Sequence, residues 1–377
     1  MTTWELITQR MGENTMESKL KFNIQAESGN ARTGHLQLGS RMATTPMLVQ
    51  TGMVPAILNS GELAALGTQA IKQSALEYWL RAQGQPDQLG FADIHEHLRW
   101  PGIVVGASGA DQAYRWAKPR GRKKTGVSFH EPATGQQKMY TPQLAQQWQR
   151  LLGCDLLVGF ARWEDYYAPV DDLQAAAQQT AEWLRMDRQL LNTLAPVVGG
   201  GLKRVRQASV AAAQATHSCG YALLGIDGAV KLAEQRRVIG EIVAMLPTEG
   251  LRYLPACGAL EQVLMAIAQG MDIVDSDCAA TTALHGTAYL GTKRLHLTQE
   301  HLAGDSRTLV PGCQCPTCQA GYSRAYLHQL LQEQSPVGVQ LLTVHNLFVL
   351  NQLVDRLRQA IAAGRLAKLM ADLAIDY

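Results

Sequence analysis

Residues 221–277 read YALLGIDGAVKLAEQRRVIGEIVAMLPTEGLRYLPACGALEQVLMAIAQGMDIVDSD. Short apolar runs at 221–228, 252–258 and 271–277 have the length of strands, and they end in glycine or polar residues. The two segments between them repeat apolar residues at the three- and four-residue spacing of an amphipathic helix. This alternation indicates consecutive β–α units and a parallel sheet.

Five more apolar runs of strand length precede this stretch. They lie at 46–52, 68–74, 102–109, 154–160 and 195–201. A helical pattern at 171–194 separates the last two. Eight strands that alternate with helices over roughly 250 residues predict an α/β fold closed into a (β/α)₈ barrel. An open doubly wound sheet is the alternative, although no G-x-G-x-x-G motif follows the first strand.

The two ends of the chain have different patterns from the predicted barrel. Residues 19–39 alternate apolar and polar side chains around a Gly-Asn turn, which predicts an antiparallel hairpin that caps the barrel. A cysteine cluster and long amphipathic segments follow residue 300. We therefore predict a flexible N-terminal extension over 1–18, a barrel over 19–300 and a zinc-binding helical subdomain over 301–377.

Composition limits the class of protein. The 377 residues carry a formal net charge of +2, so no global field favours nucleic acid. The N-terminus has acidic residues and no apolar core of a secretory signal, and no uninterrupted apolar run approaches the eighteen or so residues of a membrane span. Four cysteines are scattered singly, as is usual for reduced thiols of an intracellular protein. They are Cys154, Cys219, Cys257 and Cys278.

The other three cysteines fall within the six residues CQCPTC. Cys313, Cys315 and Cys318 favour a tetrahedral site that needs one more ligand, and Cys₃His is a common structural zinc set. An iron–sulfur cluster would need a fourth cysteine, and none follows Cys318. Two histidines are candidates for the fourth ligand. His328 lies on a predicted helix, whereas His345 lies at the start of the next one and would join two helices to the loop.

The cysteine-rich module resembles that of the tRNA-guanine (queuine) transglycosylase family. In this family a C-x-C-x-x-C motif is followed, after about 26 residues, by a histidine. The pattern matches Cys313, Cys315, Cys318 and His345, and the neighbouring "SRAYLH" and "HN" segments also agree. The resemblance extends from about residue 20 to 370. It implies an irregular (β/α)₈ barrel that carries one structural zinc ion, with His345 as the fourth ligand.

The resemblance also implies positions for the catalytic residues. In catalytic members an aspartate attacks the ribose C1′ and a second aspartate assists. Asp275, at the end of the eighth predicted strand, matches the nucleophile. The "PTR" triplet that follows it in catalytic members is absent. Ala107 and Ala161 stand where aspartates are expected, and Gly199 replaces a glutamine that contacts the purine. Three residues stand in place of that triplet: Ala279, Ala280 and Thr281.

These replacements resemble the non-catalytic accessory branch of the family in eukaryotes. The resemblance implies a cytoplasmic chain, or one attached to the mitochondrial outer membrane. Its partner would be a catalytic queuine tRNA-ribosyltransferase subunit acting on the wobble guanine of tRNAs with GUN anticodons. On its own the chain would form a homodimer. The alternatives are an active, divergent transglycosylase that uses Asp275, and a zinc-stabilised RNA-binding scaffold.

Two basic segments are candidates for contact with tRNA. The stretch "RWAKPRGRKKTG" is typical of a flexible loop that contacts phosphates, and "GLKRVRQ" follows a predicted strand. Such contacts would position RNA without reading its sequence. A solvated basic surface with no ligand is the alternative. The second segment also offers Arg206 to phosphates. The predicted tRNA-contacting residues are Arg115, Lys118, Arg120, Arg122, Lys123, Lys124, Lys203 and Arg204.

Overall fold

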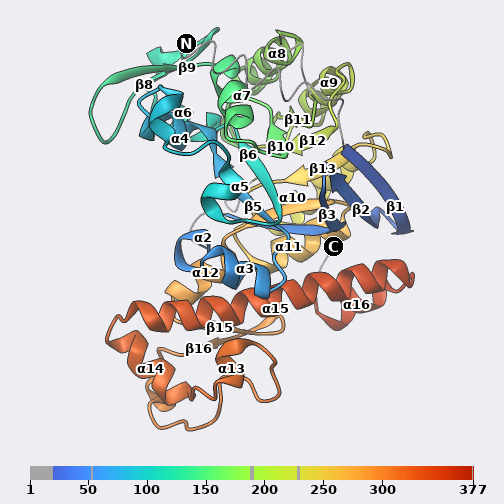
Figure 1. Cartoon of the computed structure of the whole chain (residues 1–377). Coiled ribbons are helices and arrows are strands. Elements are labelled where there is room, and N and C mark those ends of the chain that lie inside the picture. The colour runs from blue at the N-terminus through green and yellow to red at the C-terminus, as the bar shows by residue number, and fades with distance from the viewer. Residues whose placement is uncertain (1–19, 52–53, 187–190, 227–229, 376) are drawn as a thin grey trace.

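The computed structural model describes residues 20–51, 54–186, 191–226, 230–375 and 377. Within this part of the chain, eight parallel strands close into a barrel, with β14 paired to β4 (Figure 1). Each strand overlaps one of the eight predicted runs, so the prediction of a (β/α)₈ barrel is confirmed. The strands are β4 (Met47–Gln50), β5 (Ala70–Ser74), β6 (Ile103–Ala107), β10 (Leu156–Val158), β11 (Thr193–Val197), β12 (Gly220–Leu223), β13 (Leu251–Leu254) and β14 (Ile273–Ser276).

Helices surround the barrel and follow its strands. The predicted helix at 171–194 is shorter in the structure, because Asn192 takes a left-handed φ of 55° and β11 begins at Thr193. The main barrel helices are α4 (Ala75–Arg81), α7 (Pro142–Leu151), α8 (Val170–Met186), α9 (Lys203–Gln214), α10 (Leu232–Val243), α11 (Leu260–Ala268) and α12 (Cys278–Leu284). Shorter ones are α2 (Val54–Ile57), α3 (Ser60–Ala65), η1 (Pro86–Leu89), α5 (Ile94–Leu98) and α6 (Ala110–Trp116).

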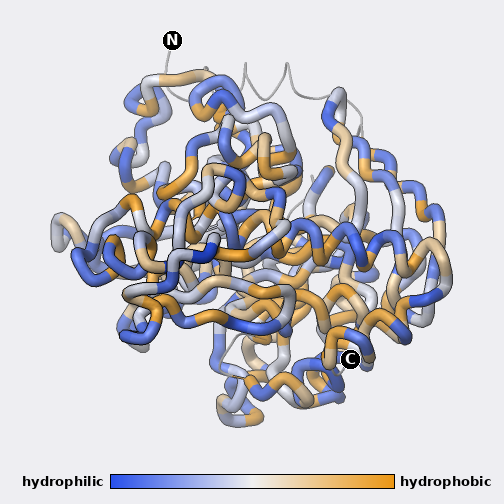
Figure 2. The backbone as a smooth tube through the Cα atoms, turned by 90° about the horizontal axis from the view of Figure 1, so that it is seen from below, coloured by the Kyte–Doolittle hydropathy of each residue, from blue (hydrophilic) through white to orange (hydrophobic). Residues whose placement is uncertain are grey.

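Side chains from alternate strand positions fill the barrel interior. This core includes Val49, Val105, Leu156 and Ile273, all of which are buried. Neighbouring positions on the same strands, such as Val274, pack outward against the helices. Figure 2 colours the backbone by hydropathy and shows apolar and polar stretches along the tube. A continuous core of this kind fixes where each strand ends, and therefore where side chains at the mouth of the barrel stand.

An antiparallel sheet closes one end of the barrel. The predicted hairpin is formed by β1 (Leu20–Ser28) and β2 (Ala31–Leu38), and the structure adds β3 (Arg41–Thr45) to it. Arg32 of β2 binds Asp272, just before β14, through two hydrogen bonds of 2.7 and 2.6 Å. Both side chains are buried, so this ion pair fixes the sheet on the barrel.

The segment after β6 forms a second small sheet outside the barrel. It contains η2 (Pro119–Gly121), β7 (Arg122–Lys123), β8 (Gly126–His130) and β9 (Gln137–Tyr140). The carbonyl of Lys123 accepts a hydrogen bond of 2.9 Å from Gln179, and that of Lys124 accepts one of 2.8 Å from Trp183. The basic stretch is thus fastened to α8. The predicted loop is therefore partly regular structure, since its residues fall in α6, η2 and β7.

A helical subdomain below the barrel completes the chain (Figure 1). It comprises β15 (Thr287–Leu290), β16 (Lys293–His296), η3 (Glu300–Leu302), α13 (Pro316–Gln319), α14 (Arg324–Gln332), α15 (Pro336–Ala362) and α16 (Leu366–Asp372). Among the described helices, only α15 has the length and apolar composition of a membrane span, but 56% of that apolar window is buried inside the protein. It contacts α11, α12, β1 and β2, which is the behaviour of a core helix.

Candidate functional site

Three cysteine sulfurs and one histidine nitrogen converge between α13 and α15. His345 Nδ1 lies 3.8 Å from Cys313 Sγ, 3.3 Å from Cys315 Sγ and 3.6 Å from Cys318 Sγ. A tetrahedral zinc ion, with Zn–S bonds of about 2.3 Å and Zn–N bonds of about 2.0 Å, holds sulfur and nitrogen ligands about 3.5 Å apart. The predicted Cys₃His set is therefore confirmed as a group that could hold one zinc ion.

Surrounding groups orient these ligands. His345 Nε2 lies 2.8 Å from the Tyr289 carbonyl oxygen, and donating a proton to it leaves Nδ1 free for the metal. The backbone N–H of Cys318 donates to Cys315 Sγ at 3.3 Å. A hydrogen bond from the Cys315 thiol is the main cause that lowers the pKa of Cys318 to about 4, which favours the thiolate that zinc binds. The site thus presents a fixed tautomer and a stabilised thiolate.

The second candidate histidine has another role. His328 on α14 is buried, and its Nδ1 lies 2.7 Å from the Leu297 carbonyl oxygen. It therefore ties α14 to the segment after β16. The prediction that His345 lies at the start of its helix was wrong. The helix α15 starts at Pro336, so His345 lies inside it. The longer helix places the metal site against a rigid core element.

At the mouth of the barrel, the buried carboxylate of Asp275 accepts hydrogen bonds from three residues. Its Oδ2 accepts a hydrogen bond from Lys72 Nζ at 2.7 Å and another from the Tyr253 hydroxyl. Its Oδ1 accepts one of 2.6 Å from the N–H of Ala256, whose left-handed φ of 62° turns that group toward the carboxylate. Burial raises the pKa of Tyr253 well above its ordinary value, so this hydroxyl remains a donor. Asp275 is 0% exposed.

This arrangement has a chemical consequence. A carboxylate nucleophile needs an oxygen lone pair that can approach the anomeric carbon of a ribose, and donors on the carboxylate lower its nucleophilicity. Both oxygens of Asp275 already accept hydrogen bonds, and the side chain of Lys72 is itself only 20% exposed. The Asp275 carboxylate is the buried member of an ion pair with Lys72. This ion pair joins β14 to β5 across the end of β4.

The neighbouring positions carry small side chains. Ala107 ends β6, and Ala161 is buried beyond β10. Gly199 and Gly200 form the turn after β11 with φ of 132° and 55°. A Cβ at Gly200 would lie 2.4 Å from the Tyr166 carbonyl oxygen, so this turn requires glycine. The cavity beside the turn holds about 10 Å³, which is room for one water molecule and not for a purine.

Arg206 fixes the same turn through hydrogen bonds to backbone carbonyls. Its Nε donates to the Gly200 carbonyl oxygen at 2.8 Å, and Nη1 donates to the carbonyls of Val197 and Leu224 at 3.2 Å. Arg206 is only 2% exposed, and burial lowers its pKa to about 10. Including it among phosphate-contacting residues was therefore wrong, because its guanidinium is directed at backbone carbonyls.

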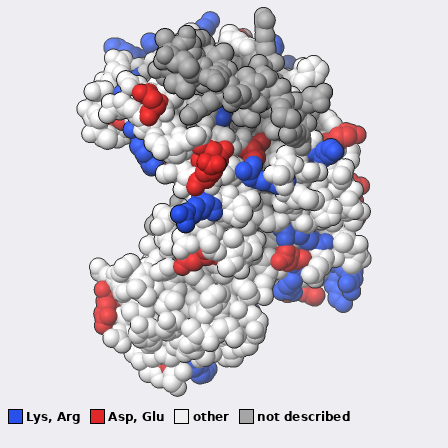
Figure 3. All heavy atoms as spheres, viewed as in Figure 1, with Lys and Arg blue, Asp and Glu red and all other residues white. Residues whose placement is uncertain are grey.

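The eight predicted tRNA-contacting residues are all exposed. Six flank or form β7, and Lys203 and Arg204 begin α9. Arg122 is partly engaged, since it pairs with Glu164 at 3.2 Å and its guanidinium lies over the Tyr114 ring. On the face shown in Figure 3 most charged side chains lie on the barrel, and few lie over the zinc-binding subdomain. Their contact with tRNA stays a prediction.

Sequence reasoning missed Lys72 and Tyr253. Both lie within predicted strands, at positions whose side chains point into the barrel. A lysine at an inward strand position was the available signal, because a buried ammonium group requires a carboxylate partner. The partner's identity depends on β5 and β14 both neighbouring β4, which the sequence alone does not show.

Comparison with known proteins agrees with this geometry. The family model described as queuine tRNA-ribosyltransferase matches residues 27–377. A queuine tRNA-ribosyltransferase of Synechococcus sp. (strain CC9311) is 28% identical over 91% of this chain and 94% of its own length. Others from Actinobacillus pleuropneumoniae serotype 5b and Nitrosomonas eutropha are 27% and 28% identical over 92% of this chain, and over 94% and 97% of their own lengths.

Proposed function

Because this chain belongs to the queuine tRNA-ribosyltransferase family, whose reaction modifies a guanine of tRNA, we propose that it is a non-catalytic subunit of such an enzyme. A catalytic chain would exchange guanine for queuine at the wobble position 34 of tRNAs with GUN anticodons, those for Asp, Asn, His and Tyr. The present chain would support that reaction by binding the catalytic chain and the tRNA. The complex would work in the cytoplasm.

The observation that supports this proposal most directly is the engagement of Asp275. The residue at the nucleophile position is buried, and Lys72, Tyr253 and Ala256 donate hydrogen bonds to its oxygens. Releasing the carboxylate would break a buried ion pair and leave Lys72 without its partner. Ala107 also supplies no proton-transferring group where a second aspartate is expected. A barrel of this kind suits a supporting role better than glycosyl transfer.

The exposed basic residues support a role on tRNA. Lys123 ends β7 and Lys124 follows it, and their carbonyls are fixed by Gln179 and Trp183 of α8. Their side chains are exposed, so they can meet phosphates without first ordering a loop. This would allow the chain to hold a tRNA while a second barrel performs the chemistry.

A base-exchange assay tests the proposal. Incorporation of labelled guanine into tRNA is measured for this chain alone, for the catalytic transglycosylase of the same organism alone, and for their mixture. We expect no incorporation by this chain, an increase in the mixture, and the same increase with Asp275→Asn. Co-elution with the partner, checked by light scattering, also separates a heterodimer from a homodimer. A partner whose activity is unchanged by this chain would refute the supporting role.

The competing function is an active, divergent transglycosylase that uses Asp275. The names of the bacterial relatives favour it, since all three are named as transferases. The same assay distinguishes the two functions. Incorporation by the purified chain alone, abolished by Asp275→Asn, together with a trapped covalent adduct between protein and RNA, would establish this alternative.

A further inference from the structure

The zinc ligand His345 and its neighbour Asn346 bind the same residue of β15. His345 Nε2 lies 2.8 Å from the Tyr289 carbonyl oxygen, and Asn346 Oδ1 accepts a hydrogen bond of 2.9 Å from the Tyr289 N–H. The Asn346 amide also donates to the carbonyl oxygens of Thr287, at 2.9 Å, and Ala279, at 3.2 Å. Two adjacent, buried residues of α15 therefore fasten the metal site to both β15 and α12.

The Tyr289 side chain continues this connection into α12. Its hydroxyl donates to the Cys278 carbonyl oxygen at 3.2 Å and lies 2.9 Å from Thr282 Oγ1. Tyr289 is buried, so water does not compete for these contacts. The backbone of Tyr289 thus binds the zinc ligand, while its side chain binds the helix that follows β14.

From α12 the hydrogen bonds reach the Asp275 carboxylate. The Cys278 N–H donates to Ser276 Oγ at 3.1 Å, and Ser276 Oγ in turn donates to the Cys257 carbonyl oxygen. The Cys257 N–H donates to the Asp275 carbonyl oxygen at 2.9 Å, and the preceding N–H, that of Ala256, donates to Asp275 Oδ1 at 2.6 Å. A buried series of hydrogen bonds therefore runs from the zinc ligand to the carboxylate at the barrel mouth.

We propose that Tyr289 is a positioning residue that couples the zinc site to the Asp275 carboxylate. A metal ion on Nδ1 fixes the His345 ring, and with it the Tyr289 carbonyl that the ring binds. When the metal is removed the ring can turn, so α12 and the donor of Ala256 lose part of their support. This inference goes beyond the proposed function, because it holds whether Asp275 is an ion-pair partner or a nucleophile.

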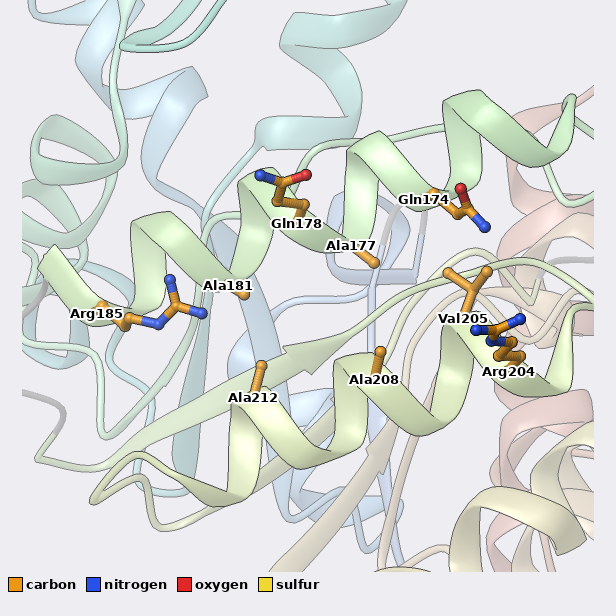
Figure 4. Close-up of a pocket in the computed structure, with 9 residues that line it drawn as sticks. All are labelled: Gln174, Ala177, Gln178, Ala181, Arg185, Arg204, Val205, Ala208 and Ala212. Atoms are coloured by element: carbon orange, nitrogen blue, oxygen red, sulfur yellow. The ribbon is translucent and has the colours of Figure 1, made fainter.

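Amide hydrogen exchange of the full chain, with zinc bound and after treatment with a chelator, tests the coupling. We expect zinc removal to raise exchange at least about tenfold in residues 256–258 and in α12, which contain no zinc ligand. The reference region is α8 and α9, which line an open groove on the barrel wall (Figure 4) and make none of these hydrogen bonds. Faster exchange confined to residues 313–319 would show that zinc supports only its own subdomain, and would overturn the proposal.

Tyr289→Phe tests the link itself. It removes the hydroxyl contacts with Cys278 and Thr282 and keeps the backbone contact at the metal site. In the zinc-loaded variant we expect exchange in α12 to rise about fivefold, which is the effect of one lost hydrogen bond. Coupling is reciprocal, so the Kd for zinc, measured by competition with a chromophoric chelator, should also rise about fivefold. Tyr326→Phe, at an exposed position on α14 of the same subdomain, is the matched control and should change both values less than twofold.

The zinc-loaded variant decides the question even if the metal-free chain unfolds as a whole, which faster exchange in α9 would reveal. Unchanged exchange in α12 together with an unchanged Kd for zinc in Tyr289→Phe would overturn the coupling. Neither measurement uses tRNA or a partner chain. A failure of the supporting role in the base-exchange assay therefore leaves this inference standing, and the reverse also holds.

Discussion

Replacing Lys72 by methionine should destabilise the fold by about 3 kcal/mol, because it leaves a buried carboxylate without its counter-ion. Lys72 Nζ lies 2.7 Å from Asp275 Oδ2, and Asp275 is 0% exposed. Methionine keeps most of the apolar stem of lysine, so packing changes little. The variant therefore measures the loss of charge rather than the loss of volume.

The magnitude follows from opposing contributions. At 2.7 Å two unit charges attract by roughly 6 kcal/mol with an effective dielectric constant of 20. Part of this is offset, because the lysine side chain is 20% exposed and the Tyr253 hydroxyl and Ala256 N–H still bind the carboxylate in the variant. Breaking buried pairs in other proteins costs about 3–5 kcal/mol, and the remaining donors place this pair at the lower limit.

Thermal unfolding followed by circular dichroism measures the effect. For a chain of 377 residues, 3 kcal/mol corresponds to a Tm lowered by about 4 °C. Lys293→Met is the matched control, since Lys293 is exposed on β16 and should change Tm by less than about 1 °C. The double variant Lys72→Met/Asp275→Asn should recover part of the loss, because no unpaired charge remains. A Lys72→Met protein as stable as wild type would refute the buried ion pair.

Three further outcomes are expected. Elemental analysis should find one zinc per chain, and Cys318→Ser should lose it with several kcal/mol of stability, whereas Cys219→Ala keeps the metal. Lys123→Ala/Lys124→Ala should weaken tRNA binding and reduce the slope of log K against log salt by about 1.4 to 1.8, as two lost phosphate contacts require. Burial raises the pKa of Tyr114 to about 12 in the folded chain. The unfolded chain therefore loses this proton at a lower pH than the folded chain does, and the free energy of unfolding falls as pH rises from 10 to 12. Tyr114→Phe, which loses no described hydrogen bond, should remove up to about 2 kcal/mol of that fall, measured by denaturant titration at both pH values.

The sequence predicts the barrel well because each strand is short, apolar and bounded by turns. It predicts the zinc ligands because three of them fall within six residues. It does not reveal the first turns of α15, where Ser335, Pro336 and Gly338 look like a loop. Pro336 instead occupies the first helical turn, and Gly338 is buried against Leu330. Local composition there is overruled by packing against α14.

The pairing at the barrel mouth could not be predicted for a different reason. Lys72 and Asp275 are 203 residues apart, and they meet only because β14 closes the barrel onto β4 beside β5. A motif search considers the residues around Asp275, whereas its partner depends on the register of three strands. The Arg32–Asp272 pair at the opposite end of β14 has the same origin.

These two ion pairs lie at the two ends of β14, the strand that carries Asp275, and the carboxylate of each pair is buried. Arg32 fixes the start of β14 to the N-terminal sheet, and Lys72 fixes its end to β5. A strand held in this way fixes the position of the Asp275 carboxylate, whose Oδ1 and Oδ2 both accept hydrogen bonds. Meanwhile the basic residues of β7 remain exposed on the outside of the barrel. The proposed supporting role depends on these outer residues, and the exchange assay of the chain with and without Asp275 decides whether the barrel mouth contributes as well.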